Sequence, residues 1–139
     1  MANRWLLKTE PSTYSYADLE REGRAVWDGV ANAVALRNMR AMAAGDLCFI
    51  YHTGDEKQIV GIAKVTKAAY PDPKGNDPRM VVIDLEPVRK LARPVTLAEV
   101  KADPRYADWE LVRQARLSVM PVTAERWGWV ESASKIKAS

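Results

Sequence analysis

Apolar and polar residues alternate along several short stretches of the chain, and others are apolar throughout. Strict alternation, or a short run rich in β-branched and aromatic residues, predicts a strand. The predicted strands span residues 4–8, 47–51, 59–65, 80–88 and 117–122. The third of these contains Gly61, which weakens a strand locally and predicts either a β-bulge or a close approach of backbone or ligand.

Other stretches repeat their apolar residues at the helical period and begin with residues that cap helices. Ser15 with Asp18, and Thr96 with Glu99, have the spacing of a capping box, and Asn32 and Thr123 can cap helices too. These patterns predict helices at residues 15–23, 32–42, 96–102, 108–112 and 123–130.

Short strands interleaved with short helices, without regular βαβ units, predict an α+β fold with a small curled sheet or barrel surrounded by helices. Residues 54–57 are turn formers and predict a hairpin between two of the strands. Residues 69–79 contain Pro71, Pro73, Gly75 and Pro78 and predict an irregular loop, either functional or simply the tip of a hairpin.

The composition is that of an ordinary globular protein, with 139 residues, 47% apolar and 28% charged. We expect one domain over residues 1–139 that folds on its own core. No apolar run reaches the length of a membrane helix and the first residues lack a signal-peptide core, so we expect a cytoplasmic protein without a membrane partner. A formal charge of +3 is compatible with a nucleic-acid partner without demanding one.

Few residues in the sequence could carry catalysis or bind a metal. Cys48 and His52 are the only cysteine and histidine, so neither an internal disulfide nor a Cys/His zinc set can form. Cys48 is expected to point inward as a small apolar residue. Phosphate-binding glycine motifs are absent, and no carboxylate pair has the spacing of an acid–base site. We therefore expect no catalytic residues, metal or cofactor.

A planar ligand is the best match to the aromatic residues. Trp27 precedes Asp28 and Gly29, and Asn32 then begins a helix, so the indole could stack on a ligand beside free amides at the helix start. The alternative is an ordinary turn with Trp27 in the core. Of Trp127 and Trp129, at least one should pack on the sheet.

Seven short motifs, in order, resemble the EVE domain family over nearly the whole chain. They are WLLKTEP at 5–11, WDGV at 27–30, GD at 45–46, YHT at 51–53, YPDP at 70–73, PVTL at 94–97 and RLSV at 116–119. The resemblance implies a PUA-like small β-barrel of about five to six mostly antiparallel strands surrounded by short helices. It also implies a monomer or weak dimer whose partner is DNA or RNA with a modified base, flipped into a pocket.

The resemblance places ten residues at or near that pocket: Trp5, Lys8, Trp27, Val30, Asn32, Tyr51, Thr53, Arg116, Leu117 and Ser118. Three positions depart from the commoner family pattern, where Ala31 replaces an arginine and Ala33 and Val34 replace larger residues. These changes could enlarge the cavity or weaken nucleic-acid affinity. Two other functions stay open: an enzyme acting on a nucleobase with His52 as base, and a small-molecule sensor or adaptor that uses the same pocket.

Overall fold

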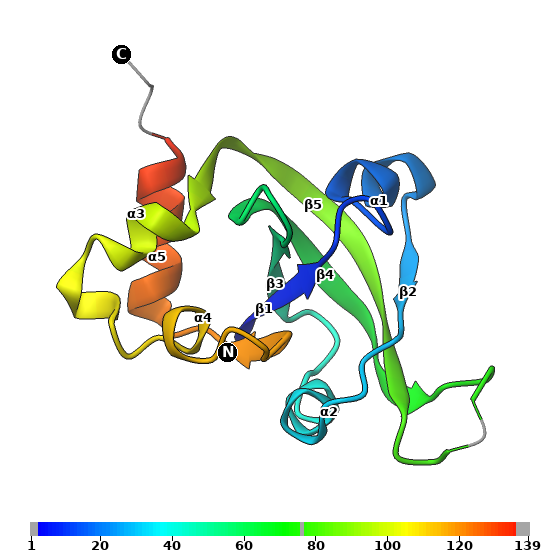
Figure 1. Cartoon of the computed structure of the whole chain (residues 1–139). Helices are drawn as coiled ribbons and strands as arrows, with labels where there is room; N and C mark the ends of the chain where they lie inside the picture. The colour runs from blue at the N-terminus through cyan, green and yellow to red at the C-terminus, as the bar shows by residue number, and fades with distance from the viewer. Residues whose placement is uncertain (1–2, 76, 136–139) are drawn as a thin grey trace.

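One curled sheet, in the order β2-β5-β4-β3-β1-β6, forms the centre of the computed structural model, which describes residues 3–75 and 77–135 (Figure 1). The strands are β1 (Arg4–Thr9), β2 (Ala25–Trp27), β3 (Leu47–His52), β4 (Gln58–Pro71), β5 (Val81–Thr96) and β6 (Val119–Pro121). Neighbours pair antiparallel except β1 and β3, which are parallel. The α+β class and the mostly antiparallel pairing are confirmed.

The helices are α1 (Tyr16–Glu22), α2 (Ala33–Arg40), α3 (Leu97–Lys101), α4 (Glu110–Arg113) and α5 (Ala124–Ser134), with a 3₁₀ turn η1 (Pro104–Tyr106). Four of the five α-helices of the described chain begin at the predicted caps Ser15, Asn32, Thr96 and Thr123, whereas α4 begins after Trp109, which has no side-chain capping bond. Both capping boxes form as predicted, with Ser15 and Asp18 at α1 and with Thr96 and Glu99 at α3. The left-handed Gly23 ends α1, and its N–H donates to the Leu19 carbonyl at 2.8 Å.

The loop predicted at residues 69–79 is confirmed in part, because residues 72–75 and 77–79 form the tip of the long hairpin of β4 and β5, whereas residues 69–71 belong to β4. Tyr70 pairs with Val82 and Pro71 with Val81, so the strands continue almost to the hairpin tip. Several register shifts let the sheet curl along this hairpin. The three residues of β2 and the 3₁₀ turn η1 were not predicted, because segments of this length show no hydrophobic period.

Of the predicted curled sheet or barrel, the structure has the curled sheet, because the sheet remains open between its two ends and does not close into a barrel. β2 pairs with β5 alone, and β1 lies between β3 and the short β6, so β1 and β2 face each other without pairing. β6 pairs only with residues 5–7 of β1, which leaves the end of β1 at Lys8 and Thr9 beyond its ladder. The curled sheet therefore has an unclosed seam between β1 and β2.

Aromatic residues from both halves of the chain contribute to the core. The ring of Phe49 on β3 stacks on Trp127 of α5 with centroids 3.7 Å apart, which fixes α5 against the sheet. Cys48 is fully buried beside it, as predicted, and burial raises the pKa of its thiol. Tyr106 and Trp109, in the segment between α3 and β6, are also buried and meet edge to face.

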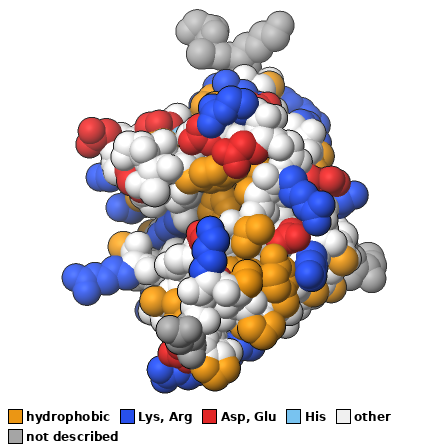
Figure 2. All heavy atoms as spheres, turned by 90° about the vertical axis from the view of Figure 1, so that its right-hand side faces the viewer, with side chains coloured by type: hydrophobic (Ala, Val, Ile, Leu, Met, Phe, Trp, Pro, Cys, Tyr) orange, Lys and Arg blue, Asp and Glu red, His pale blue; other side chains and the backbone are white. Residues whose placement is uncertain are grey.

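The face that carries β2 and β5 shows a band of hydrophobic side chains bordered by charged ones (Figure 2). Val26 on β2 has 52% of its surface exposed, the largest fraction among the exposed bulky hydrophobic residues of the described chain.

In the described part of the chain, no helix is both long and apolar enough to span a bilayer.

Candidate functional site

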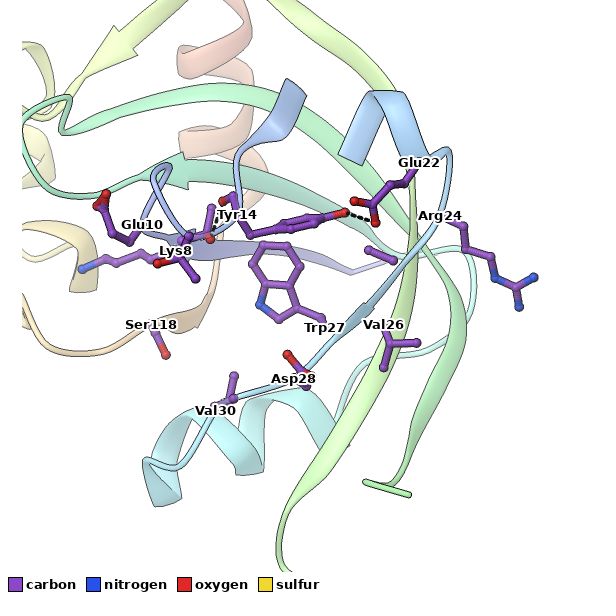
Figure 3. A pocket seen from close by; sticks show the side chains of 14 residues that line it. Lys8, Glu10, Tyr14, Glu22, Arg24, Val26, Trp27, Asp28, Val30 and Ser118 are labelled. Atoms are coloured by element: carbon purple, nitrogen blue, oxygen red, sulfur yellow. Dashed lines mark hydrogen bonds between the residues drawn. The ribbon is translucent and has the colours of Figure 1, made fainter. Parts of the chain in front are cut away.

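A pocket of about 600 Å³ opens in the seam between β1 and β2. Its size lies within the range of small-molecule sites in proteins. β1 and β2 form opposite walls, α1 with the turn before it forms one end, and the segment leading into α2 forms the other (Figure 3). Its lining residues include Lys8, Thr9, Tyr14, Glu22, Trp27, Asp28, Val30 and Ser118. The pocket therefore occupies the place where a barrel would have closed.

Trp27 and Tyr14 form the aromatic part of the pocket. Their rings meet edge to face with centroids 6.2 Å apart and an interplanar angle of 83°, and Trp27 is only 7% exposed (Figure 3). The Tyr14 hydroxyl donates to Glu22 Oε1 at 3.2 Å. Burial, and then the Glu22 carboxylate, raise the pKa of Tyr14 to about 12, so the phenol stays neutral at physiological pH. The indole is thus held in place before any ligand arrives.

Lys8 joins the pocket to the turn that precedes β6. Its main-chain N–H donates to the Ser118 carbonyl at 2.9 Å, and its Nζ donates to the Ala115 carbonyl at 3.0 Å. The ammonium also lies 5.7 Å from the ring centroid of Tyr51. Partial burial lowers the pKa of Lys8. Lys8 therefore brings a positive charge and Ser118 together at one wall.

The remaining polar groups give the pocket a mixed lining. Glu10, Glu22 and Asp28 supply carboxylates, and Arg24 stands at the outer edge, where it pairs with the buried Asp84 at 3.2 Å. Hydrogen bonds from Ser12 lower the pKa of Glu10. Donors and acceptors around an aromatic wall suit a planar polar ligand better than an anion.

Four of the ten predicted site residues line this pocket: Lys8, Trp27, Val30 and Ser118. Three others, Asn32, Arg116 and Leu117, line a separate hollow of about 260 Å³. The Asn32 side chain accepts from the N–H groups of Val34 and Ala35, at 2.9 and 3.0 Å, and so caps α2 as predicted.

The other three predicted residues do not line the pocket. Trp5 is buried, and its indole N–H donates to Asp46 Oδ2 at 2.9 Å in the core. Tyr51 is buried beneath Lys8. The Thr53 hydroxyl donates to the Thr9 carbonyl at 3.3 Å, which ties the ends of β1 and β3 together.

Ten residues of the lining were missed from the sequence, and among them are Thr13, Tyr14, Glu22 and Arg24. Tyr14 precedes α1, Glu22 is the last residue of α1, and Arg24 follows it. No motif or period marks them, since they meet Trp27 only because α1 packs at the end of the seam. Their one signal was the capping box at Ser15, which fixes where the helix begins.

Both ring nitrogens of His52 make hydrogen bonds within the protein. Its Nε2 accepts from the main-chain N–H of Tyr16 at 3.0 Å, so the proton is on Nδ1, which lies 2.9 Å from Glu56 Oε1 and donates to it. The ring is buried and joins β3 to the start of α1. Across residues 3–75 and 77–135, no three His, Cys, Asp or Glu side chains gather as a metal site would require.

The departures from the family pattern fall outside the pocket. Ala31 and Ala33 line a third hollow, of about 380 Å³, between α2 and residues 77–80. Val34 lines the hollow that contains Arg116. The three replacements therefore change the surroundings of the pocket and leave its own walls untouched.

Comparison with known proteins gives matches along almost the entire chain. The family model described as the EVE domain matches residues 3–133. Thymocyte nuclear protein 1 of Mus musculus is 30% identical over 173 residues, covering 100% of this chain and 76% of that protein.

Solved structures match equally widely. A protein of Rhodopseudomonas palustris, solved by NMR, is 42% identical with a TM-score of 0.91, covering 99% of this chain and 97% of its own. Human THYN1, solved in complex with DNA that contains 5-methylcytosine, is 29% identical with a TM-score of 0.90, covering 99% of this chain and 100% of that one. An ASCH protein of Zymomonas mobilis, 12% identical with a TM-score of 0.57, shares the fold alone.

Proposed function

The chain belongs to the EVE domain family, and we propose that it is a non-catalytic module that reads a modified nucleobase through the pocket between β1 and β2. The observation that carries the proposal is the braced indole of Trp27 in an open seam lined by polar groups. The human THYN1 structure, in complex with DNA containing 5-methylcytosine, supports the ligand class.

An extruded base needs an aromatic surface to stack on and polar groups along its edge. Trp27 offers the surface, and its contact with Tyr14 keeps it from moving when the base enters. Lys8 can donate to the base edge, while Glu22 and Asp28 can accept from an exocyclic amino group. The pocket thus has both kinds of partner that cytosine and its methylated form require.

The main chain at the pocket wall adds further hydrogen-bonding groups. In the described residues, the backbone of Asp28, Gly29 and Val30 makes no hydrogen bond to another part of the chain. Gly29 has a positive φ of 76°, which turns the chain between β2 and α2 and keeps this backbone at the wall. Free N–H and C=O groups here can bind the edge of the base.

Titration with single-stranded oligonucleotides that carry either 5-methylcytosine or cytosine at the centre tests the proposal, with matched DNA and RNA versions. We expect tighter binding of the methylated strand. Trp27→Ala should weaken that binding by about 1–3 kcal/mol, the value of one base stacked on an aromatic residue.

Trp129→Ala is the matched control. Trp129 packs on Tyr106, with ring centroids 5.1 Å apart, and does not line the pocket. Circular dichroism would establish that both variants are folded. Equal weak binding of all strands, or equal effects of the two substitutions, would contradict the proposal. A cytosolic location and a monomer or weak dimer stay predictions.

A further inference from the structure

The segment that leaves the pocket forms a ridge between two further hollows. Residues 31–34 follow directly after Val30 of the pocket wall. Ala31 and Ala33 face the hollow of about 380 Å³, while Asn32 and Val34 face the hollow of about 260 Å³. A nucleic-acid strand that leaves the pocket across this ridge would meet one hollow on each side.

Both hollows combine apolar residues with an arginine, and the larger one also has the ion-paired Arg79 and Asp77 in its lining. Leu36 and Met80 lie in the larger one together with Arg40. Leu117 and Val34 lie in the smaller one together with Arg116, and Val34 is 39% exposed. An exposed bulky hydrophobic residue beside an arginine matches a nucleotide, which has an apolar base face and a charged phosphate.

The two arginines carry charge that the protein does not neutralise. Within the described chain, neither Arg40 nor Arg116 has a carboxylate oxygen within 4.0 Å. Arg40 instead donates to the Arg79 main-chain carbonyl at 2.6 Å, and the Arg79 guanidinium is paired with Asp77 at 2.8 Å. Arg40 and Arg116 thus remain free to contact phosphates.

We propose that the two hollows hold the nucleotides on either side of the base in the pocket, with Arg40 and Arg116 against their phosphates. This inference rests on the proposed function, since it needs one base in the pocket to place the strand. A strand continues in both directions from an extruded base, and the hollows lie on both sides of the ridge. The binding unit is therefore a trinucleotide with the modified base at its centre.

Two ligands distinguish binding in the pocket from binding in the two hollows. One is the nucleoside 5-methyl-2′-deoxycytidine, and the other is the single-stranded DNA trinucleotide with 5-methylcytosine between two thymidines. Removing both charges with Arg40→Gln and Arg116→Gln should weaken trinucleotide binding about tenfold. Calorimetric affinity for the nucleoside should not change. The salt dependence of trinucleotide binding should fall by about 0.7 in logarithmic slope for each phosphate that an arginine no longer neutralises.

The matched control removes two charges elsewhere, with Lys90→Gln and Lys101→Gln. Both lysines are exposed, and neither lines any of the three hollows. A steric variant, Ala33→Trp, fills the larger hollow from the exposed first residue of α2 and should weaken trinucleotide binding without affecting the nucleoside.

The inference is overturned if the arginine variant binds the trinucleotide as the lysine control does, or if it loses nucleoside and trinucleotide binding equally. Trp27→Ala tests the pocket separately. If that variant binds the methylated trinucleotide as the unmodified protein does, the proposed function fails. If it weakens binding while the arginine variant behaves like the control, only the flanking hollows fail.

Discussion

The ring of Tyr16 fills the space that a side chain at residue Gly61 would need. A Cβ built on Gly61 would lie 2.5 Å from Cε1 and Cζ of Tyr16, closer than real atoms approach. The Tyr16 hydroxyl donates to the Ile62 carbonyl at 2.8 Å, so the contact links α1 to β4. The bulge predicted at Gly61 is confirmed by the register shifts of β4 against both of its neighbours. The group that approaches Gly61 closely is the side chain of Tyr16, and not the backbone or ligand that the alternative named.

Gly61→Ala should therefore destabilise the protein by about 1–3 kcal/mol, because the added methyl forces the Tyr16 ring and its helix outward. Urea unfolding measures the loss. Gly128→Ala is the control, since a Cβ at this position in α5 meets no atom within 4 Å. Alanine should there be neutral or stabilising by about 0.5–1 kcal/mol. Equal stability of the two variants would refute the contact.

Trp5→Phe should lower stability and leave nucleic-acid affinity unchanged. The substitution removes the indole N–H that donates to the buried Asp46, a loss of about 1–3 kcal/mol for a hydrogen bond to a charged group. Thermal unfolding measures the stability, and titration with the methylated oligonucleotide measures the affinity. Trp27→Phe should behave in the opposite way in the titration, because Trp27 lines the pocket. Weaker binding by Trp5→Phe would place Trp5 in the site after all.

Two substitutions at Tyr14 distinguish the role of its ring from the role of its hydroxyl. Tyr14→Phe keeps the edge-to-face contact with Trp27 and should bind the methylated strand as the unmodified protein does. Tyr14→Ala removes that contact, worth about 0.5–1.5 kcal/mol, and frees the indole to move, so affinity should fall. Anisotropy titration of both variants measures this. If Tyr14→Phe loses as much as Tyr14→Ala, the hydroxyl contacts the ligand directly.

Glu99 should make the stability of the protein depend on acid pH. The bidentate hydrogen bond from Arg93, at 2.7 and 2.9 Å, lowers the pKa of Glu99 from 4.5 to about 2. Because the folded-state pKa is the lower one, the stabilisation is complete above about pH 4.5 and is lost as the pH falls towards 2. Glu99→Gln should therefore be less stable at neutral pH and lose less stability on acidification.

The midpoint of thermal unfolding, followed from pH 7 to pH 2, measures the effect. Glu20→Gln is the control, because Glu20 is exposed on α1 and has no ion-pair partner within the described chain. Parallel curves for the unmodified protein and Glu99→Gln would show that the pair with Arg93 contributes nothing.

The local structure of this protein was predictable from the sequence because its signals are local. Capping by Ser15, Asn32 and Thr96 depends on residues within one helical turn, and each cap forms where the sequence places it. Strand periods located β3 and the start of β5 for the same reason. The local turn before Asn32 already indicated Trp27, whereas the pocket residues Lys8 and Ser118 were found through family motifs, whose spacing carries information about the fold that local patterns lack.

Only the tertiary structure decided which strand edges stay unpaired, and with them the position of the pocket. A closed barrel and an open seam have the same local patterns along the sequence. Closure depends on which strands pair with β1 and β2, and these partners, such as β6 and β5, are far from them in sequence. The seam turns Tyr14 and Glu22 towards Trp27 and keeps Trp5 in the core on Asp46. Burial and hydrogen bonding between distant segments place Trp27 in the pocket and Trp5 in the core. No periodic pattern along the sequence distinguishes these two positions.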